Sequence, residues 1–213
     1  MTDTDWIIRF SKGLDENAGP AERERILEGC ASFRPEKDPE GTARWISGAI
    51  ERMEGSLDRP ACERVMLACS HRYPENKMLD YRALYERTGD VDLVLRKICE
   101  DTEAAGLSFV KRPERKGDEI LFTKVPCDTD GYRQAADDTE RRFRYCHCDV
   151  VRELTRLEDM TIPEVFCACG GGWYATLWEG ILKEPVRVEL VESVLQGASC
   201  CTFRIRLPEG TRT

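Results

Sequence analysis

The stretch VRVELVESVLQGASCCTFRIRL, residues 186–207, decides the fold class of this chain. On both sides of Gly197, apolar residues alternate with charged or polar ones, a pattern typical of strands that are buried on one face. The alternating apolar residues are Val186, Val188 and Leu190 before the glycine, and Phe203, Ile205 and Leu207 after it. The pattern predicts a half-buried antiparallel hairpin.

The sequence that precedes this hairpin contains another strand and two helices. Residues 120–125, Ile-Leu-Phe-Thr-Lys-Val, follow the polar stretch 112–118 and predict a strand. Between the two β regions, apolar residues at three- and four-residue spacing predict two helices. The first stripe contains Val150, Val151, Leu154 and Leu157, and the second contains Tyr174, Leu177, Trp178, Ile181 and Leu182.

The first hundred residues have helical periodicity throughout. The recurring apolar residues are Ile46, Ile50 and Met53, then Cys62, Val65, Met66 and Cys69, then Val91, Val94 and Ile98. Helix-breaking residues such as Pro60 and Gly89 separate these groups, so we expect five or six short helices. The chain is therefore predicted to be α+β: a helical N-terminal half followed by an antiparallel sheet packed against two or more helices. We place the boundary between a helical region, 1–104, and an α+β domain, 105–213.

Composition limits the classes of function. A net charge of −8 argues against general binding to nucleic acid, which requires a basic face. No stretch approaches the roughly 20 apolar residues that a membrane-spanning helix needs, and the acidic first residues do not have the form of a secretory signal. We expect a cytoplasmic protein whose partner is a small-molecule ligand or substrate, and the sequence is also compatible with a homo-oligomer.

Four of the eleven cysteines form two similar CxC pairs. Cys146 and Cys148 lie in Tyr-Cys-His-Cys-Asp, and Cys167 and Cys169 lie in Phe-Cys-Ala-Cys-Gly. Each pair directly precedes an apparent helix, where unpaired N–H groups and the positive end of the helix dipole stabilise thiolates over thiols. Asp149 is the predicted cap of the first helix. The neighbouring arginines 141, 142, 144 and 152 would offset the negative charge.

Four thiolates are enough for a tetrahedral metal site. We expect zinc bound by Cys146, Cys148, Cys167 and Cys169, with an iron–sulfur cluster as the second choice. His147 is an alternative ligand. Zinc ligands within a pair are usually separated by two to four residues, and CxC is tighter than this.

Two other interpretations of the cysteines stay open. In the first, Cys146 or Cys167 is a catalytic nucleophile, or the pairs act as a redox switch, with Asp149 and His147 as candidates for moving protons. In the second, the cysteines are packed side chains, because free cysteine is among the most buried residue types.

The run Gly170, Gly171 and Gly172 follows the second CxC pair. Glycines let the backbone turn tightly and approach a ligand closely. They are therefore candidate binding residues for a cofactor or for an anionic ligand, such as a carboxylate, at a helix N-terminus.

Three segments of the C-terminal half resemble a known family. They are the strand from Ile120 to Cys127, the YCxxD element Tyr145 to Asp149, and the closing strand Cys201-Thr202-Phe203-Arg204 after Gly197. Over roughly residues 118–207 they resemble the L-2-amino-thiazoline-4-carboxylic acid hydrolase-like family. The closing hairpin is also similar to the 4-vinyl reductase domain, a small-molecule-binding module.

The first resemblance implies hydrolysis of a cyclic C–N bond in a small sulfur-containing amino acid derivative. It carries over Cys146 and Asp149 as candidate catalytic residues. The second cysteine of each CxC pair and the glycine run depart from the pattern of that family. Two functions follow: a small-molecule-binding protein with a cysteine-bound metal, or a hydrolase of small cyclic amidine or amide C–N bonds that uses a cysteine nucleophile or metal-bound water.

Overall fold

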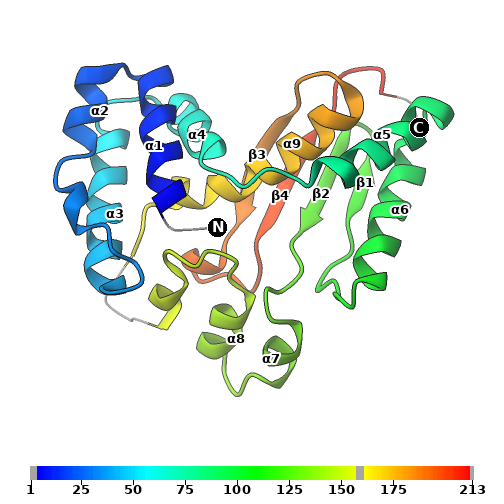
Figure 1. Cartoon of the computed structure of the whole chain (residues 1–213). Helices are drawn as coiled ribbons and strands as arrows, with labels where there is room; N and C mark the ends of the chain where they lie inside the picture. The colour runs from blue at the N-terminus through cyan, green and yellow to red at the C-terminus, as the bar shows by residue number, and fades with distance from the viewer. Residues whose placement is uncertain (1–3, 157–160, 212–213) are drawn as a thin grey trace.

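The structure, a computed structural model, describes residues 4–156 and 161–211. It has the predicted α+β architecture, with a helical first half and a four-stranded antiparallel sheet in the second half (Figure 1). Helices of the first half are α1 (Thr4–Asn17), α2 (Pro20–Ile26), α3 (Pro39–Glu54), α4 (Arg59–Ala68), α5 (Glu75–Thr88) and α6 (Val91–Ala104), with the 3-10 helix η1 (Cys30–Ser32).

The helix boundaries of the first half follow from local capping chemistry. The carboxylates of Asp38, Asp58 and Asp90 accept hydrogen bonds from backbone N–H groups at the start of α3, α4 and α6. Gly89 ends α5 in the left-handed conformation, which a glycine adopts without steric cost. These are the breaks that the sequence indicates, and the prediction of five or six helices is confirmed.

The second half alternates strands with short helices. Its elements are β1 (Glu114–Lys116), β2 (Glu119–Thr123), α7 (Thr129–Gln134), α8 (Asp138–Tyr145), η2 (Arg152–Arg156), η3 (Glu164–Gly170), α9 (Gly171–Leu182), β3 (Arg187–Glu192), η4 (Val194–Gln196) and β4 (Thr202–Arg206). The predicted helix after Val150 is instead the 3-10 helix η2, in which the Thr155 hydroxyl donates to the carbonyl of Arg152. Leu157, predicted on the same stripe, lies outside the described residues.

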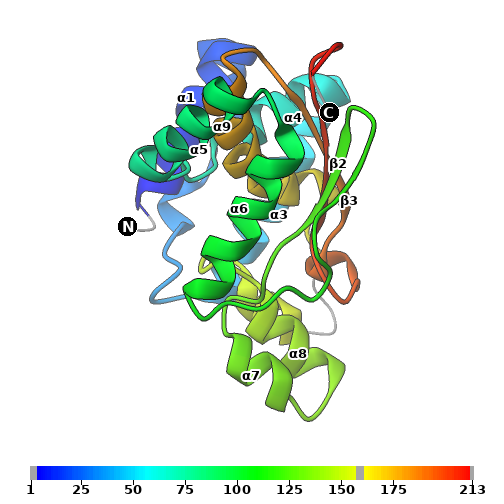
Figure 2. The same cartoon turned by 90° about the vertical axis from the view of Figure 1, so that its right-hand side faces the viewer.

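The sheet has the strand order β1-β2-β4-β3, and every neighbouring pair is antiparallel. The predicted hairpin is confirmed as β3 and β4, with Val188 opposite Ile205. Because β2 pairs with β4, Ile120 also lies opposite Ile205, so three strands present one apolar row. Figure 2 shows α5, α6 and α9 on one side of this sheet.

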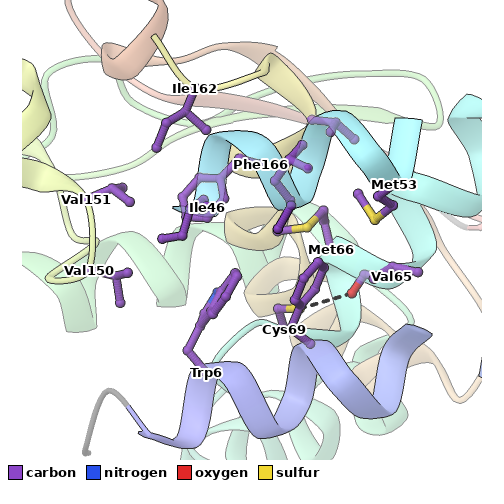
Figure 3. Packing of buried hydrophobic residues seen from close by; sticks show 14 of the residues in the cluster. Trp6, Ile46, Met53, Val65, Met66, Cys69, Val150, Val151, Ile162 and Phe166 are labelled. Atoms are coloured by element: carbon purple, nitrogen blue, oxygen red, sulfur yellow. Dashed lines mark hydrogen bonds between the residues drawn. The ribbon is translucent and has the colours of Figure 1, made fainter. Parts of the chain in front are cut away.

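Two apolar clusters form most of the core, and each draws on both sides of residue 105. The first joins α1, α3 and α4 to residues between 150 and 168, and Figure 3 shows Trp6 beside Val150 and Phe166 within it. The second joins α5, α6 and α9 to the sheet. Within the part of the chain that is described, no helix is long and apolar enough to cross a membrane.

Candidate functional site

A cavity of about 490 Å³ lies where the two apolar clusters meet. Its walls come from α1, the end of α4, α6, β2, the segment after α8, η3 and α9. Four of the predicted site residues line it: His147, Cys148, Asp149 and Cys169, and Gly170 joins them from the glycine run. Segments that are far apart in the sequence therefore build one site.

One part of the wall is aromatic. The rings of Tyr73 and Trp173 contact at a tilt of 57° with centroids 4.9 Å apart, and the ring centroids of Phe122 and Tyr174 are 4.7 Å apart. Phe109, from the segment between α6 and β1, contacts Phe122 at 6.2 Å. Because neighbouring rings in contact restrict one another's movement, they form a rigid apolar surface for a ligand.

The other part of the wall is polar and carries positive charge. Lys124 follows β2, and its Nζ is 5.9 Å from the centroid of the Phe203 ring. The same atom is 3.3 Å from the point where a Cβ on Gly170 would lie. Among residues 4–156 and 161–211, no carboxylate forms an ion pair with Lys124. Arg9 also lines the cavity, and its Nε donates to the carbonyl of Cys69 at 2.9 Å.

Both histidines of the cavity are neutral at pH 7. Burial of the ring, and then the charges of Arg9 and Lys124, lower the pKa of His71. The pKa of His147 is lowered by desolvation and then by Lys124. Although His147 is an exposed residue, its ordinary pKa of about 6.5 is already below 7, so any downward shift leaves it neutral. Its Nε2 lies 2.7 Å from the carbonyl oxygen of Val125, to which a neutral ring donates.

The structure divides each CxC pair between two environments. Cys148 and Cys169 line the cavity, together with Cys69 at the end of α4. Cys146 instead belongs to a buried cluster with Tyr145, Val194 and Cys200, and neither Cys146 nor Cys167 lines the cavity. One sulfur of each pair therefore faces the ligand space and the other faces the interior.

The pocket thiols are protonated at neutral pH. Burial raises the pKa of Cys148 to about 12 and that of Cys169 to about 11. After burial, the charge of Cys169 is the largest contribution that raises the pKa of Cys148. The backbone at Val151 and at Val150 lowers this pKa and so partly opposes the shift.

The interior thiols form a second group behind the pocket wall. The Ser193 hydroxyl donates to the Cys167 sulfur at 2.9 Å. Burial raises the pKa of Cys167 strongly, and the charge of Cys201 adds to that rise. Burial likewise raises the pKa of Cys146 far above its ordinary range, so a nucleophilic thiolate at this position is strongly disfavoured.

The thiols do not occupy the helix N-termini that the sequence indicates. Cys146 ends α8, and Cys167 and Cys169 lie inside η3, which runs directly into α9. The nearby arginines pair with carboxylates: Arg144 contacts Asp128 and Glu140, and Arg152 contacts Asp149. Burial therefore outweighs the available positive charge and favours the protonated thiols over the predicted thiolates.

The predicted metal centre is not assembled in the described residues. No group of three or more His, Cys, Asp or Glu side chains among them has an arrangement that could hold a metal ion. A tetrahedral zinc site needs four converging ligands, and of the four predicted ones Cys148 and Cys169 line the cavity while Cys146 and Cys167 do not. Zinc and an iron–sulfur cluster stay sequence-based predictions.

Asp149 is exposed and lies 3.4 Å from Arg152 in an ion pair. The turn before η2 is held instead by the carbonyl of Cys148, which accepts from the N–H groups of Val151 and Arg152. Asp149 therefore lines the cavity as an ion-paired carboxylate.

The glycine run has a packing role more than a binding role. A Cβ on Gly172 would lie 2.3 Å from the carbonyl oxygen of Leu67, and one on Gly171 would lie 3.0 Å from a methyl group of Val188. Only Gly170 lines the cavity. The N–H of Gly171 already donates to carbonyls of η3, so this helix start does not present it to an anion.

Sequence reasoning did not identify Trp6, Arg9, Tyr73 or Lys124 as site residues. Trp6 and Arg9 have the spacing of a helix face, which indicates packing rather than binding. Lys124 is the one charged residue within the strand-like run 120–125. This is the single local feature of the sequence that could have identified one of these four residues as a site residue.

Comparisons with curated proteins and with solved structures find no match. One family model matches residues 22–211, which include nearly all of the elements that build the cavity. This chain belongs to that family, which is described as a family of unknown function (DUF6144).

Proposed function

We propose that this protein binds a small molecule with an apolar body and one anionic group in the cavity of about 490 Å³. The observation that carries the proposal is the ammonium group of Lys124, which lies in an aromatic-walled cavity with no carboxylate partner in the described chain. A cation in such surroundings gains most from a ligand anion, since charge pairs strengthen as water is excluded.

Size and surface support a ligand with an apolar body. Protein pockets for small molecules typically enclose about 300–1,000 Å³ and are mostly apolar. The rings of Tyr73, Trp173, Phe122 and Tyr174 give the cavity its apolar part. Trp6 also lines the cavity, and its buried Nε1–H has no hydrogen-bond partner in the described structure.

The charge balance of the wall supports an anionic group. At pH 7 the thiols and both histidines of the wall are neutral, and Lys124 has no carboxylate partner among the described residues. Asp149 is already paired with Arg152. The wall therefore presents the positive charge of Lys124 in a chain whose net charge is −8, and this contrast favours an anionic ligand at the site.

A matched pair of fluorescent probes tests this proposal. 8-Anilinonaphthalene-1-sulfonate has an aromatic body and a sulfonate, and N-phenyl-1-naphthylamine has the same rings without the sulfonate. We expect one anionic probe to bind per chain. The Lys124→Met variant should weaken that binding by about tenfold or more, because a hydrogen bond to a charged group contributes about 1.5–3 kcal/mol.

Two comparisons make the test specific. Binding of the uncharged probe should be nearly unchanged in Lys124→Met, since that variant keeps the length of the side chain. Lys116→Met, which removes an exposed lysine of β1, should leave both affinities unchanged. Equal loss of both probes, or no loss of the anionic one, would contradict the proposal.

The hydrolase alternative has a different nucleophile from the one the resemblance implies. In a cavity-based reaction the thiol would be Cys148, because it lines the cavity next to His147 while Cys146 is buried behind it. The backbone at Val150 and Val151, which lowers the pKa of Cys148, would favour a developing thiolate. Turnover of 2-amino-thiazoline-4-carboxylate that survives in Cys146→Ser and disappears in Cys148→Ser supports this assignment, and the reverse pattern contradicts it.

A further inference from the structure

We propose that the cavity selects monocarboxylates with an unbranched hydrocarbon chain, which enter chain first and keep the carboxylate beside Lys124. The class of the ligand and its direction are thereby added to the proposed function, on which they rest. The direction follows from where the buried and the exposed residues of the wall lie.

The floor of the cavity is apolar and comes from helices and a strand. Ile98 of α6, Leu177 of α9 and Phe122 of β2 form this floor, and they are 3%, 1% and 7% exposed, respectively. All three belong to the apolar cluster that α5, α6 and α9 form with the sheet, and Figure 2 shows α6 and α9 on the same side of β2. An ionised carboxylate would lose its hydrating water among these side chains at a high cost in free energy, whereas a hydrocarbon chain has no polar group to desolvate.

The rim of the cavity comes from connecting segments and is mostly polar. Its exposed residues are His71 between α4 and α5, Leu107 after α6, and His147 and Asp149 after α8. A charged group that stays near this rim keeps part of its hydration. The charged end of a ligand therefore belongs at the rim and its apolar end at the floor.

Lys124 lies between the floor and the rim. It follows Phe122 by two residues, and its N–H donates to the carbonyl of Cys201 at 3.0 Å, which continues the pairing of β2 with β4. Residues two apart in such an extended segment share a face and are about 6.6 Å apart. Toward the rim, Nε2 of His147 lies 2.7 Å from the carbonyl oxygen of Val125. The Lys124 ammonium group can therefore hold an anion near the rim while the body of the ligand reaches the floor.

The aromatic part of the wall favours a flexible chain over a flat ring system. Its ring pairs are tilted by 57°, 41° and 63°, for Tyr73 with Trp173, Phe122 with Tyr174, and Phe109 with Phe122. A fused planar ligand gains most from parallel faces, which tilted rings do not offer. An unbranched chain can rotate about each C–C bond and follow such a wall.

A series of straight-chain acids tests the ligand class on the native chain. The full-length protein is titrated by calorimetry with the acids from hexanoate to tetradecanoate, below their micelle-forming concentrations. Affinity should rise by about fourfold per CH₂ and then level off once the floor is filled. Dodecanedioate should bind about tenfold more weakly than dodecanoate, or weaker still, because its second carboxylate would enter the apolar floor. Anthracene-2-carboxylate, which is rigid and planar, should bind more weakly than undecanoate.

Two enlarged side chains on α6 locate the end of the bound chain. Ile98→Phe fills part of the floor and should shorten the acid at which affinity levels off. Leu95→Phe makes the same kind of change at a residue that is 7% exposed and does not line the cavity, so it should leave that length unchanged. If Ile98→Phe does not fold, the acid series on the native chain still decides the ligand class.

The outcomes distinguish the ligand class from the proposed function. Affinity that is independent of chain length, equal binding of dodecanedioate and dodecanoate, or tighter binding of the planar acid overturns the ligand class. An unchanged length in a folded Ile98→Phe variant overturns the assigned direction. In each of these cases, weaker dodecanoate binding in Lys124→Met would still support the proposed function. If dodecanoate and its methyl ester bind equally well and Lys124→Met changes neither affinity, the proposed function itself fails.

Discussion

Replacing Gly172 by alanine should destabilise the protein, although alanine is the better helix former. Gly172 lies in the first turn of α9, where the helix crosses the end of α4. An added Cβ would lie 2.3 Å from the carbonyl oxygen of Leu67 and 2.5 Å from the Cβ of Ser70. Both are atoms that no side-chain rotation can move far, so α9 must recede.

The size of the effect follows from the distance. The separation from the Leu67 oxygen must grow by about 1 Å to reach an ordinary contact, and such backbone shifts in packed interiors cost about 1–3 kcal/mol or more. Helix propensity returns at most about 1 kcal/mol. A net loss of about 2 kcal/mol would lower the melting temperature of a chain of this size by about 4–8 °C.

Thermal and urea unfolding followed by circular dichroism measure this change. Gly48→Ala is the matched control: Gly48 lies within α3, and an added Cβ would meet only the mobile guanidinium of Arg52, at 3.2 Å. That variant should be as stable as the native chain or more stable, by up to about 1 kcal/mol. If Gly172→Ala proves as stable as Gly48→Ala, the close approach of α9 to α4 is not as described.

Three more predictions concern charges, thiols and metal. The Thr202 hydroxyl, and after it Lys111, lower the pKa of Glu192. The Glu192 carboxylate therefore stabilises the fold at pH values above its ordinary pKa, and this contribution is lost as pH falls. Glu192→Gln should lower the urea midpoint of unfolding at pH 7 and have little effect at pH 3. Iodoacetamide at pH 7.5 should label the exposed Cys30 first and the buried Cys146 orders of magnitude more slowly, as peptide mapping would report, and preferential labelling of Cys146 would restore the nucleophile prediction. Elemental analysis of protein purified without chelators tests the zinc prediction: about one zinc per chain would support it, and a metal-free, reduced preparation of unchanged stability would contradict it.

Much of the fold could be predicted from local patterns. The alternation around Gly197 identifies β3 and β4 because a strand places successive side chains on opposite faces. The helical stripes and the capping aspartates identify α3, α4 and α6 for the same kind of reason. The segment after Val150 was predicted to be an α-helix and forms a 3-10 helix instead. A short apolar run with β-branched residues does not distinguish these two kinds of helix.

The candidate site was predicted only in part. The CxC pairs, His147 and Asp149 were predicted as site residues, and four of these residues line the cavity. The aromatic wall and Lys124 were not identified, because they come together only when α4, α9 and β2 pack against one another. No local spacing encodes such an approach.

The sequence by itself determined the α+β class, the position of most helices and the hairpin, since these depend on contacts between near neighbours and on one buried face. Only the tertiary structure decided which sulfur of each CxC pair meets the cavity. In a 3-10 helix, residues two apart are rotated by roughly 240° about the axis, so Cys167 and Cys169 point in different directions. The packing of η3 against its neighbours then assigns one direction to the ligand space and the other to the interior, and the same packing brings Lys124 beside Gly170.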